Sequence, residues 1–141
     1  MLAAVAKTLL PKVRHSACVA VLLLAAVVQP VRADLLDDAR SNNTAAVLVA
    51  IADKADVNVR SSDGTSALHW AVYNSNAAMV RALLRAGADV NARNEYGSSP
   101  MSEAGVLGSE QLLALLLDAG ADVESPTLEG QTVLMSVVRT P

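Results

Sequence analysis

The chain has 141 residues, with 11 Lys and Arg against 14 Asp and Glu, for a formal net charge of −3. All 14 acidic residues lie at or after Asp34 together with only 7 of the 11 basic ones, so that part carries 7 − 14 = −7. We therefore expect no nucleic-acid binding, because such binding depends mainly on neutralising phosphates. The single cysteine, Cys18, precedes this part, which therefore cannot form a disulfide within itself.

Residues 1–33 differ in composition from the rest. They contain no acidic residue and an unbroken apolar run over 17–28, and their basic residues are Lys7, Lys12, Arg14 and Arg32. A run of 12 residues is shorter than the roughly 20 that span a bilayer. We predict a cleaved secretory signal peptide over 1–33, with cleavage after Ala33. An uncleaved membrane anchor is the alternative.

From Asp34 onward the sequence repeats every 33 residues. The segment Ala86-Gly-Ala-Asp-Val-Asn91 returns as Ala119-Gly-Ala-Asp-Val-Glu124, and a weaker copy ends at Asn58. The same spacing separates three glycines, Gly64, Gly97 and Gly130. A period of this length is typical of a solenoid. We expect one domain over 34–141, with repeats at about 34–60, 61–93, 94–126 and an incomplete 127–141.

The first repeat is expected to cap the stack. Its leading helix has a polar face, as a terminal repeat needs, with Asp34, Asp37, Asp38, Arg40, Ser41 and Asn42.

The second repeat shows two helices. After Ser66, the first helix places Ala67, Leu68, Ala71 and Val72 on one face. The second helix, over about 77–86, does the same with Met79, Val80, Leu83 and Leu84. Gly87 is expected to end it, because glycine adopts the positive φ common after a helix. Residues 90–97 then form an extended loop, and the third repeat follows the same plan.

The fourth repeat begins with an apolar helix and stops at Pro141. Because a solenoid needs a finished, soluble last repeat, we expect that the sequence is a fragment. The alternative is a protein that ends half-way through a repeat.

These repeats resemble the ankyrin family. The closing Gly-Ala-Asp-Val-Asn motif is nearly intact, and the opening Thr-Pro-Leu-His motif is present in degraded forms, Ser66-Ala-Leu-His69, Ser99-Pro-Met-Ser102 and Thr132-Val-Leu-Met135. The resemblance covers residues 34–141. It implies an all-α repeat solenoid of about 3.5 repeats, each a helix-turn-helix with a projecting β-hairpin loop. It also implies that His69 has a structural role in hydrogen bonding between repeats.

Catalytic and metal-binding functions are not favoured. His69 is the only histidine after residue 33, where cysteine is absent, so a metal site or an activated nucleophile would depend on it alone. General-base work by His69 is the alternative to its structural role. Asp56, Asp89 and Asp122 recur one per repeat, not in a calcium-loop spacing, and are expected to accept backbone amides. We predict no enzyme activity, cofactor or metal.

The resemblance implies a concave binding surface formed by the first helices and the loop tips. The positions there that vary between repeats include all three aromatic residues, the side chains typical of interface hot spots. Trp70 has the alternative of packing against a neighbouring repeat, and Tyr73 and Tyr96 are expected to be exposed. The predicted protein-binding residues are Trp70, Tyr73, Asn74, Arg93, Glu95, Tyr96, Glu103, Val106, Leu107 and Glu129.

We therefore expect a monomeric binding protein in the periplasm or outside the cell, with a protein partner and no membrane contact after signal cleavage. One alternative is an inhibitor or immunity protein for an exported toxin or enzyme with a basic surface. Another is the recognition arm of a larger enzyme that continues beyond residue 141.

Overall fold

The computed structural model describes residues 34–124 and, beyond them, Gly130, Thr132, Met135 and Val138. The predicted signal peptide over 1–33 lies outside the described residues. Six α-helices lie within residues 34–124. In chain order they are α2 (Leu35–Arg40), α3 (Thr44–Ala52), α4 (Ala67–Tyr73), α5 (Ala77–Arg85), α6 (Pro100–Leu107) and α7 (Glu110–Asp118).

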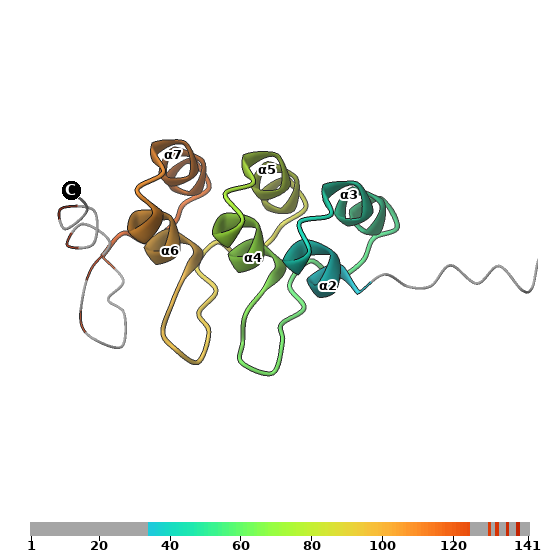
Figure 1. The fold of residues 1–141 in the computed structure, drawn as a ribbon, viewed down its shortest axis with the longest axis horizontal. Coiled ribbons are helices and arrows are strands. Elements are labelled where there is room, and N and C mark those ends of the chain that lie inside the picture. Colours follow the sequence, from blue (N-terminus) through green and yellow to red (C-terminus); the bar gives the residue numbers. More distant parts are fainter. Residues whose placement is uncertain (1–33, 125–129, 131, 133–134, 136–137, 139–141) are drawn as a thin grey trace, which may run out of the picture. The chain divides into compact units, whose positions relative to one another are not determined.

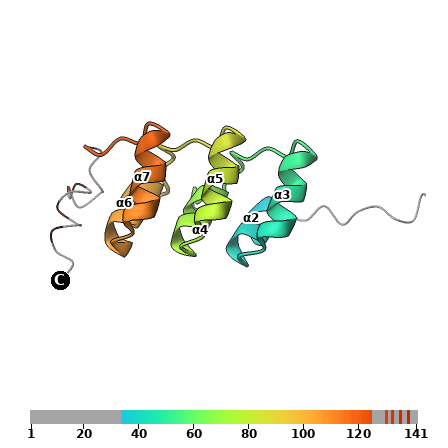
Figure 2. The ribbon, with the colours of Figure 1, turned by 90° about the horizontal axis from the view of Figure 1, so that it is seen from above.

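The helices form two layers within residues 34–124. The first helices of the three repeats, α2, α4 and α6, pack side by side, and the second helices α3, α5 and α7 pack in the same order (Figures 1 and 2). Within each repeat the two helices also contact one another. This arrangement confirms the predicted all-α repeat fold.

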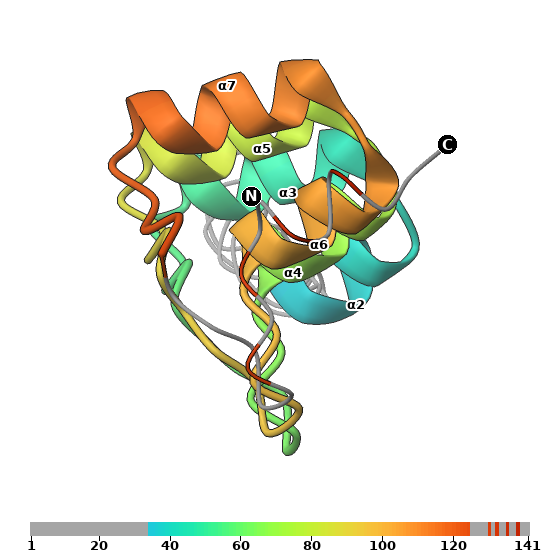
Figure 3. The same ribbon diagram turned by 90° about the vertical axis from the view of Figure 1, so that its left-hand side faces the viewer.

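A loop projects from between successive repeats, and in the view along the stack these loops extend to the same side of the helices (Figure 3). The loop before α4 contains an isolated antiparallel bridge between Arg60 and Ser66. No regular strand forms in the described residues. Each loop therefore has only a few backbone hydrogen bonds between its own residues.

The turn between the paired helices has the same design in each repeat. Asn42, Ser75 and Gly108 occupy equivalent positions with positive φ angles of 59°, 53° and 64°. The residue that follows caps the second helix, since Asn43, Asn76 and Ser109 each accept a hydrogen bond from the amide three residues on. Such caps satisfy amides that lack a partner within the helix. The first helix of repeat one, α2, spans only Leu35–Arg40, so the prediction that Asp34, Ser41 and Asn42 lie on it is wrong: Asp34 and Ser41 cap the helix and Asn42 belongs to the turn.

The core consists of the apolar faces that the periodicity predicts. Leu68, Val72, Met79, Val80 and Leu83 are completely buried, and Leu112 and Leu116 continue the same packing in the third repeat. Gly87 follows α5 with φ +89°, as predicted. In the capping repeat, Leu35 and Ala39 are buried and Asp37 is exposed.

Only part of the predicted fourth repeat is described. Met135 and Val138 are helical and 60% and 80% exposed. Leu117 on α7 is also half-exposed, at 49%.

Candidate protein-binding surface

His69 joins α4 to the next repeat. Its Nδ1 lies 3.2 Å from the backbone nitrogen and 2.8 Å from Oγ of Ser66, and its Nε2 lies 3.1 Å from the carbonyl oxygen of Ser98. A carbonyl can only accept, so Nε2 carries the proton and Nδ1 accepts from Ser66. Burial lowers the pKa of His69 below its usual value. Both ring nitrogens are thus used in the scaffold, as the structural role predicts.

The repeated aspartates also belong to the scaffold. Asp56, Asp89 and Asp122 each accept a hydrogen bond from the amide two residues on, at 2.9, 3.0 and 2.9 Å. Asn58 and Asn91 link successive repeats. The side chain of each accepts a hydrogen bond, at 2.8 Å, from the backbone N–H of the aspartate in the next repeat. This confirms the prediction that the aspartates accept hydrogen bonds from backbone amides. The described part of the chain contains no cluster of three or more potential metal ligands.

The projecting loops are tied to one another from the side. The Glu95 amide donates to the carbonyl of Asp63 at 2.8 Å, and Arg60 reaches both the Asp89 carboxylate at 3.1 Å and the Arg93 carbonyl at 3.4 Å. Within its loop, Asp63 accepts from the Ser61 hydroxyl and from Thr65. These hydrogen bonds lower the pKa of Asp63. The loop tips are therefore presented in a fixed arrangement.

An exposed row of side chains crosses the ends of the first helices. Arg40, Tyr73 and Val106 stand at equivalent positions 33 residues apart on α2, α4 and α6, and Leu107 follows Val106. Tyr73 is 66% exposed and Val106 is 65% exposed. Because the three helices pack side by side, these four residues lie at matching positions on neighbouring helices. We call Arg40, Tyr73, Val106 and Leu107 the inner row.

Trp70 lies beside the inner row and is partly buried against the core. Its ring meets that of Tyr73 edge to face, with centroids 5.9 Å apart, and the guanidinium of Arg40 lies 5.3 Å from the indole centroid. Both contacts have favourable geometry, since a ring face is negative and its edge is positive. Trp70 therefore packs against the neighbouring repeat and also borders the exposed row.

Asn74 and Glu103 differ in how their polar groups are satisfied. The Asn74 amide donates to the carbonyl of Ala39 at 3.0 Å, so it closes the end of α2. One oxygen of Glu103, Oε1, accepts from the Ser98 hydroxyl at 3.3 Å. The other, Oε2, is buried with no hydrogen-bond partner among the described residues. Burial raises the pKa of Glu103 to about 7. An unpaired buried acceptor costs about 1–3 kcal/mol.

Comparison with known families gives a match over most of these elements. A family model described as ankyrin repeats, three copies, matches residues 35–127. The chain belongs to the ankyrin-repeat family. Ankyrin repeats are generic protein–protein interaction modules, and proteins built from them are typically binding modules without catalytic activity. No curated protein matches the chain.

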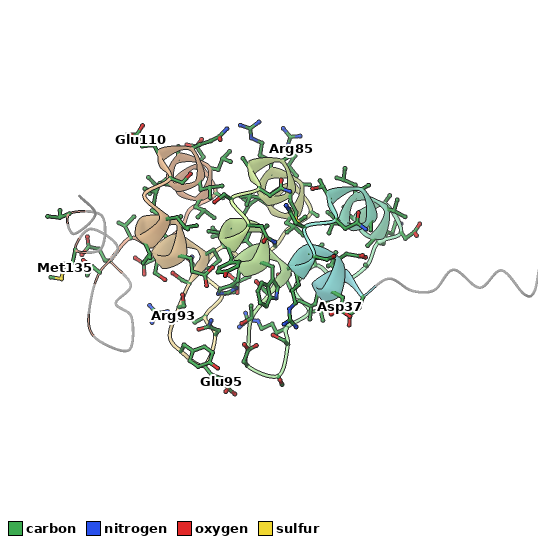
Figure 4. All side chains as sticks on the ribbon, in the orientation of Figure 1. Asp37, Arg85, Arg93, Glu95, Glu110 and Met135 are labelled. Carbon is green, nitrogen blue, oxygen red and sulfur yellow. The ribbon has the colours of Figure 1, made fainter. Side chains whose placement is uncertain are left out.

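The ankyrin fold separates the predicted binding residues into three groups. Tyr73, Val106 and Leu107 come together in the inner row, with Trp70 and Glu103 on its border. Arg93, Glu95 and Tyr96 lie on the loop between α5 and α6, where Tyr96 is 70% exposed (Figure 4 labels Arg93 and Glu95). Asn74 is engaged within the scaffold, and Glu129 lies outside the described residues.

Arg40 is an exposed residue of the inner row, although the sequence predicts for it only a place on the polar cap. Its place in this row can be predicted from the repeat, because Arg40 precedes Tyr73 by one full period. Its position over the indole could not be predicted from spacing alone.

Within residues 34–124 and the four described positions beyond, no helix has both the length and the apolar character needed to cross a membrane.

Proposed function

We propose that this ankyrin-repeat protein is exported and captures a protein partner on its inner row and loop tips. The observation that carries the proposal is that Tyr73, Val106 and Leu107 are all exposed at the ends of neighbouring first helices, with Tyr96 exposed on the loop between α5 and α6. Contiguous exposed apolar side chains often mark a contact site. Aromatic side chains also contribute disproportionately to binding energy at protein interfaces.

The rigidity of the surface supports the same proposal. The loops are joined to one another through Asp63 and Glu95, and α4 is joined to the next loop through His69. A surface that is already ordered before binding loses less conformational entropy when a partner docks. The inner row and loop tips are therefore suited to hold a partner without rearrangement.

Export is proposed from the composition of residues 1–33. Four basic residues and a 12-residue apolar run without any acid favour a signal peptide. The partner is then expected in the periplasm or outside the cell. The net charge of −7 after residue 33 favours a second candidate of the same kind, an inhibitor that covers a basic exported enzyme or toxin.

Site-specific photo-cross-linking in cells tests the proposal. A benzophenone amino acid replaces Tyr73, Tyr96 or, as a control, Val49, which is 61% exposed on α3 in the second-helix layer. We expect the same partner to cross-link from positions 73 and 96 and not from 49, and mass spectrometry to find Asp34 at the amino terminus of the product. A partner that cross-links only from position 49 would contradict the binding surface, and a retained 1–33 segment would contradict signal cleavage.

A further inference from the structure

We propose that the partner pairs an aspartate or glutamate side chain with the guanidinium of Arg40, at the α2 end of the inner row. The inference rests on the proposed function, because it specifies one chemical group of the partner that docks there. Three observations support it: the pairing state of Arg40, the ring that positions its side chain, and the exposed apolar residues beside it.

The guanidinium of Arg40 lies at the surface without a carboxylate partner. Arg40 is exposed in the last turn of α2. The one salt bridge among the described residues joins Arg60 to Asp89, so Arg40 has no ion-pair partner in that part of the chain. A guanidinium carries five N–H donors, and it binds a carboxylate strongly through two of them. Arg40 is therefore able to receive a carboxylate from outside.

Trp70 fixes this guanidinium and leaves its donors available. The guanidinium carbon of Arg40 lies over the Trp70 ring, 5.3 Å from the centroid. Trp70 is itself partly buried against the core and meets Tyr73 edge to face at 5.9 Å. Stacking occupies one face of the planar guanidinium, whereas the N–H donors point outward in its plane. Because the side chain is already ordered, pairing with a carboxylate has a lower entropic cost.

Exposed apolar side chains lie on the helices next to this cation. Tyr73 stands on α4, beside α2, and Val106 stands on α6, beside α4, and both side chains are mostly exposed. A partner that covers Tyr73 also excludes water from the neighbouring Arg40 and Trp70. Contacts that exclude water in this way surround the strongest positions of protein interfaces. An ion pair formed there is expected to contribute more than one left in solvent.

The charge of the array limits what else the partner carries. Residues 34–124 contain six basic and 13 acidic residues, so this part carries 6 − 13 = −7. A field of this sign repels a uniformly acidic partner. We therefore expect a single acidic residue among apolar or basic ones, which agrees with the second candidate function, an inhibitor of a basic exported protein.

The spacing of the first helices defines a suitable probe. Packed helices lie about 8–10 Å apart, so a partner helix that rises about 1.5 Å per residue advances roughly seven residues from one first helix to the next. Such a step is close to two turns, which returns to the same helix face. A helix with one carboxylate and two leucines at this spacing can therefore reach Arg40, Tyr73 and Val106 together.

The test uses the full chain and two capped peptides of about 20 residues, long enough to form a helix. Both are built on alanine and lysine and carry two leucines at the roughly seven-residue spacing; the first position of that series is glutamate in one peptide and glutamine in the other. Anisotropy of a label on the peptide measures affinity, and emission of Trp70, the single tryptophan, reports docking beside Arg40. We expect the glutamate peptide to bind about ten-fold more tightly at low ionic strength.

Matched variants assign that preference to Arg40. Arg40→Gln is expected to reduce the preference to less than about two-fold. Arg85→Gln is the control and is expected to keep it, because Arg85 is also exposed and also lies in the last turn of its helix, α5. Equal affinity for the two peptides, equal effects of the two variants, or no change in Trp70 emission up to about 1 mM glutamate peptide would each overturn the inference.

A third variant separates this inference from the proposed function. Tyr73→Ala is expected to weaken both peptides, because their leucine side chains pack on the inner row. If Tyr73→Ala leaves both affinities unchanged, the inner row is not the docking surface and the proposed function is contradicted. If it weakens both peptides while Arg40→Gln retains the glutamate preference, only the carboxylate subsite is contradicted. Circular dichroism of each variant confirms that it is folded.

Discussion

His69 and Glu103 are two titratable side chains on first helices, and their hydrogen bonds differ. Both nitrogens of His69 have partners, one in its own repeat and one in the next. Glu103 has one partner, Ser98, and one unpaired oxygen. A fully satisfied buried group stabilises a scaffold, whereas a partly satisfied one costs stability. At this scale His69 stabilises the fold, whereas the ionised Glu103 carboxylate destabilises it, because burial raises the pKa of Glu103.

The raised pKa of Glu103 predicts a specific dependence of stability on pH. The pKa is about 7 in the folded chain against 4.5 for the ordinary side chain, so between these values the unfolded chain loses this proton first. The contribution of Glu103 to the free energy of unfolding therefore decreases as the pH rises from 4.5 to 7. Glu103→Gln, which removes the titration, is expected to raise the free energy of unfolding by about 1–2 kcal/mol at pH 8 and to change it little at pH 4.

Urea unfolding of the wild-type chain and Glu103→Gln at both pH values measures this difference. Glu110→Gln on α7 is the control for removal of a surface charge. A variant that is less stable than the wild-type chain at pH 8 would show that the carboxylate stabilises the fold, contrary to the prediction.

At the scale of elements, the sequence period was sufficient to predict the helices and their buried faces. Leu68, Val72, Met79 and Leu83 lie in the core where the 3.6-residue pattern placed them. The contacts between loops could not be predicted, because the Glu95 amide finds the Asp63 carbonyl only after two repeats have stacked. The burial of Glu103 was missed for the same reason. Periodicity predicts which face of a helix is buried, whereas contacts at a seam depend on neighbouring repeats.

Close packing between loops predicts a difference between two glycines. Gly64 and Gly87 both have positive φ, at +78° and +89°. A Cβ on Gly64 would lie 3.1 Å from Cα of Asn94 in the next loop, whereas one on Gly87 would meet nothing within 4 Å. Gly87→Ala is expected to lower the free energy of unfolding by about 1 kcal/mol, from backbone strain alone. Gly64→Ala is expected to cost about 2 kcal/mol or more, because the clash adds to the strain.

Urea unfolding compares the two glycine variants directly. Equal losses of stability for Gly64→Ala and Gly87→Ala would contradict tight packing between the loops. A larger loss for Gly87→Ala would show that the loop before α4 relaxes more easily than the turn after α5.

At the scale of the whole repeat array, the described residues separate a scaffold from a surface. The scaffold recurs in each repeat and uses the same hydrogen bonds, such as those of Asp56, Asp89 and Asp122. The surface changes along the stack, from Arg40 through Tyr73 to Val106 in the inner row. Variation at fixed positions on a constant frame allows one fold to recognise different partners. Under the proposed function, we expect these side chains, and not the repeat itself, to select the partner.

The most direct test of this separation compares two valines of nearly equal exposure. Val106 in the inner row is 65% exposed, and Val49 on α3 is 61% exposed. With the partner identified by cross-linking, Val106→Ser is expected to raise its dissociation constant about ten-fold or more, and Val49→Ser to change it less than about two-fold, with both variants melting near the wild-type temperature. If Val49→Ser weakens binding as much as Val106→Ser, or if Val106→Ser leaves the dissociation constant unchanged, the inner row is not the binding surface.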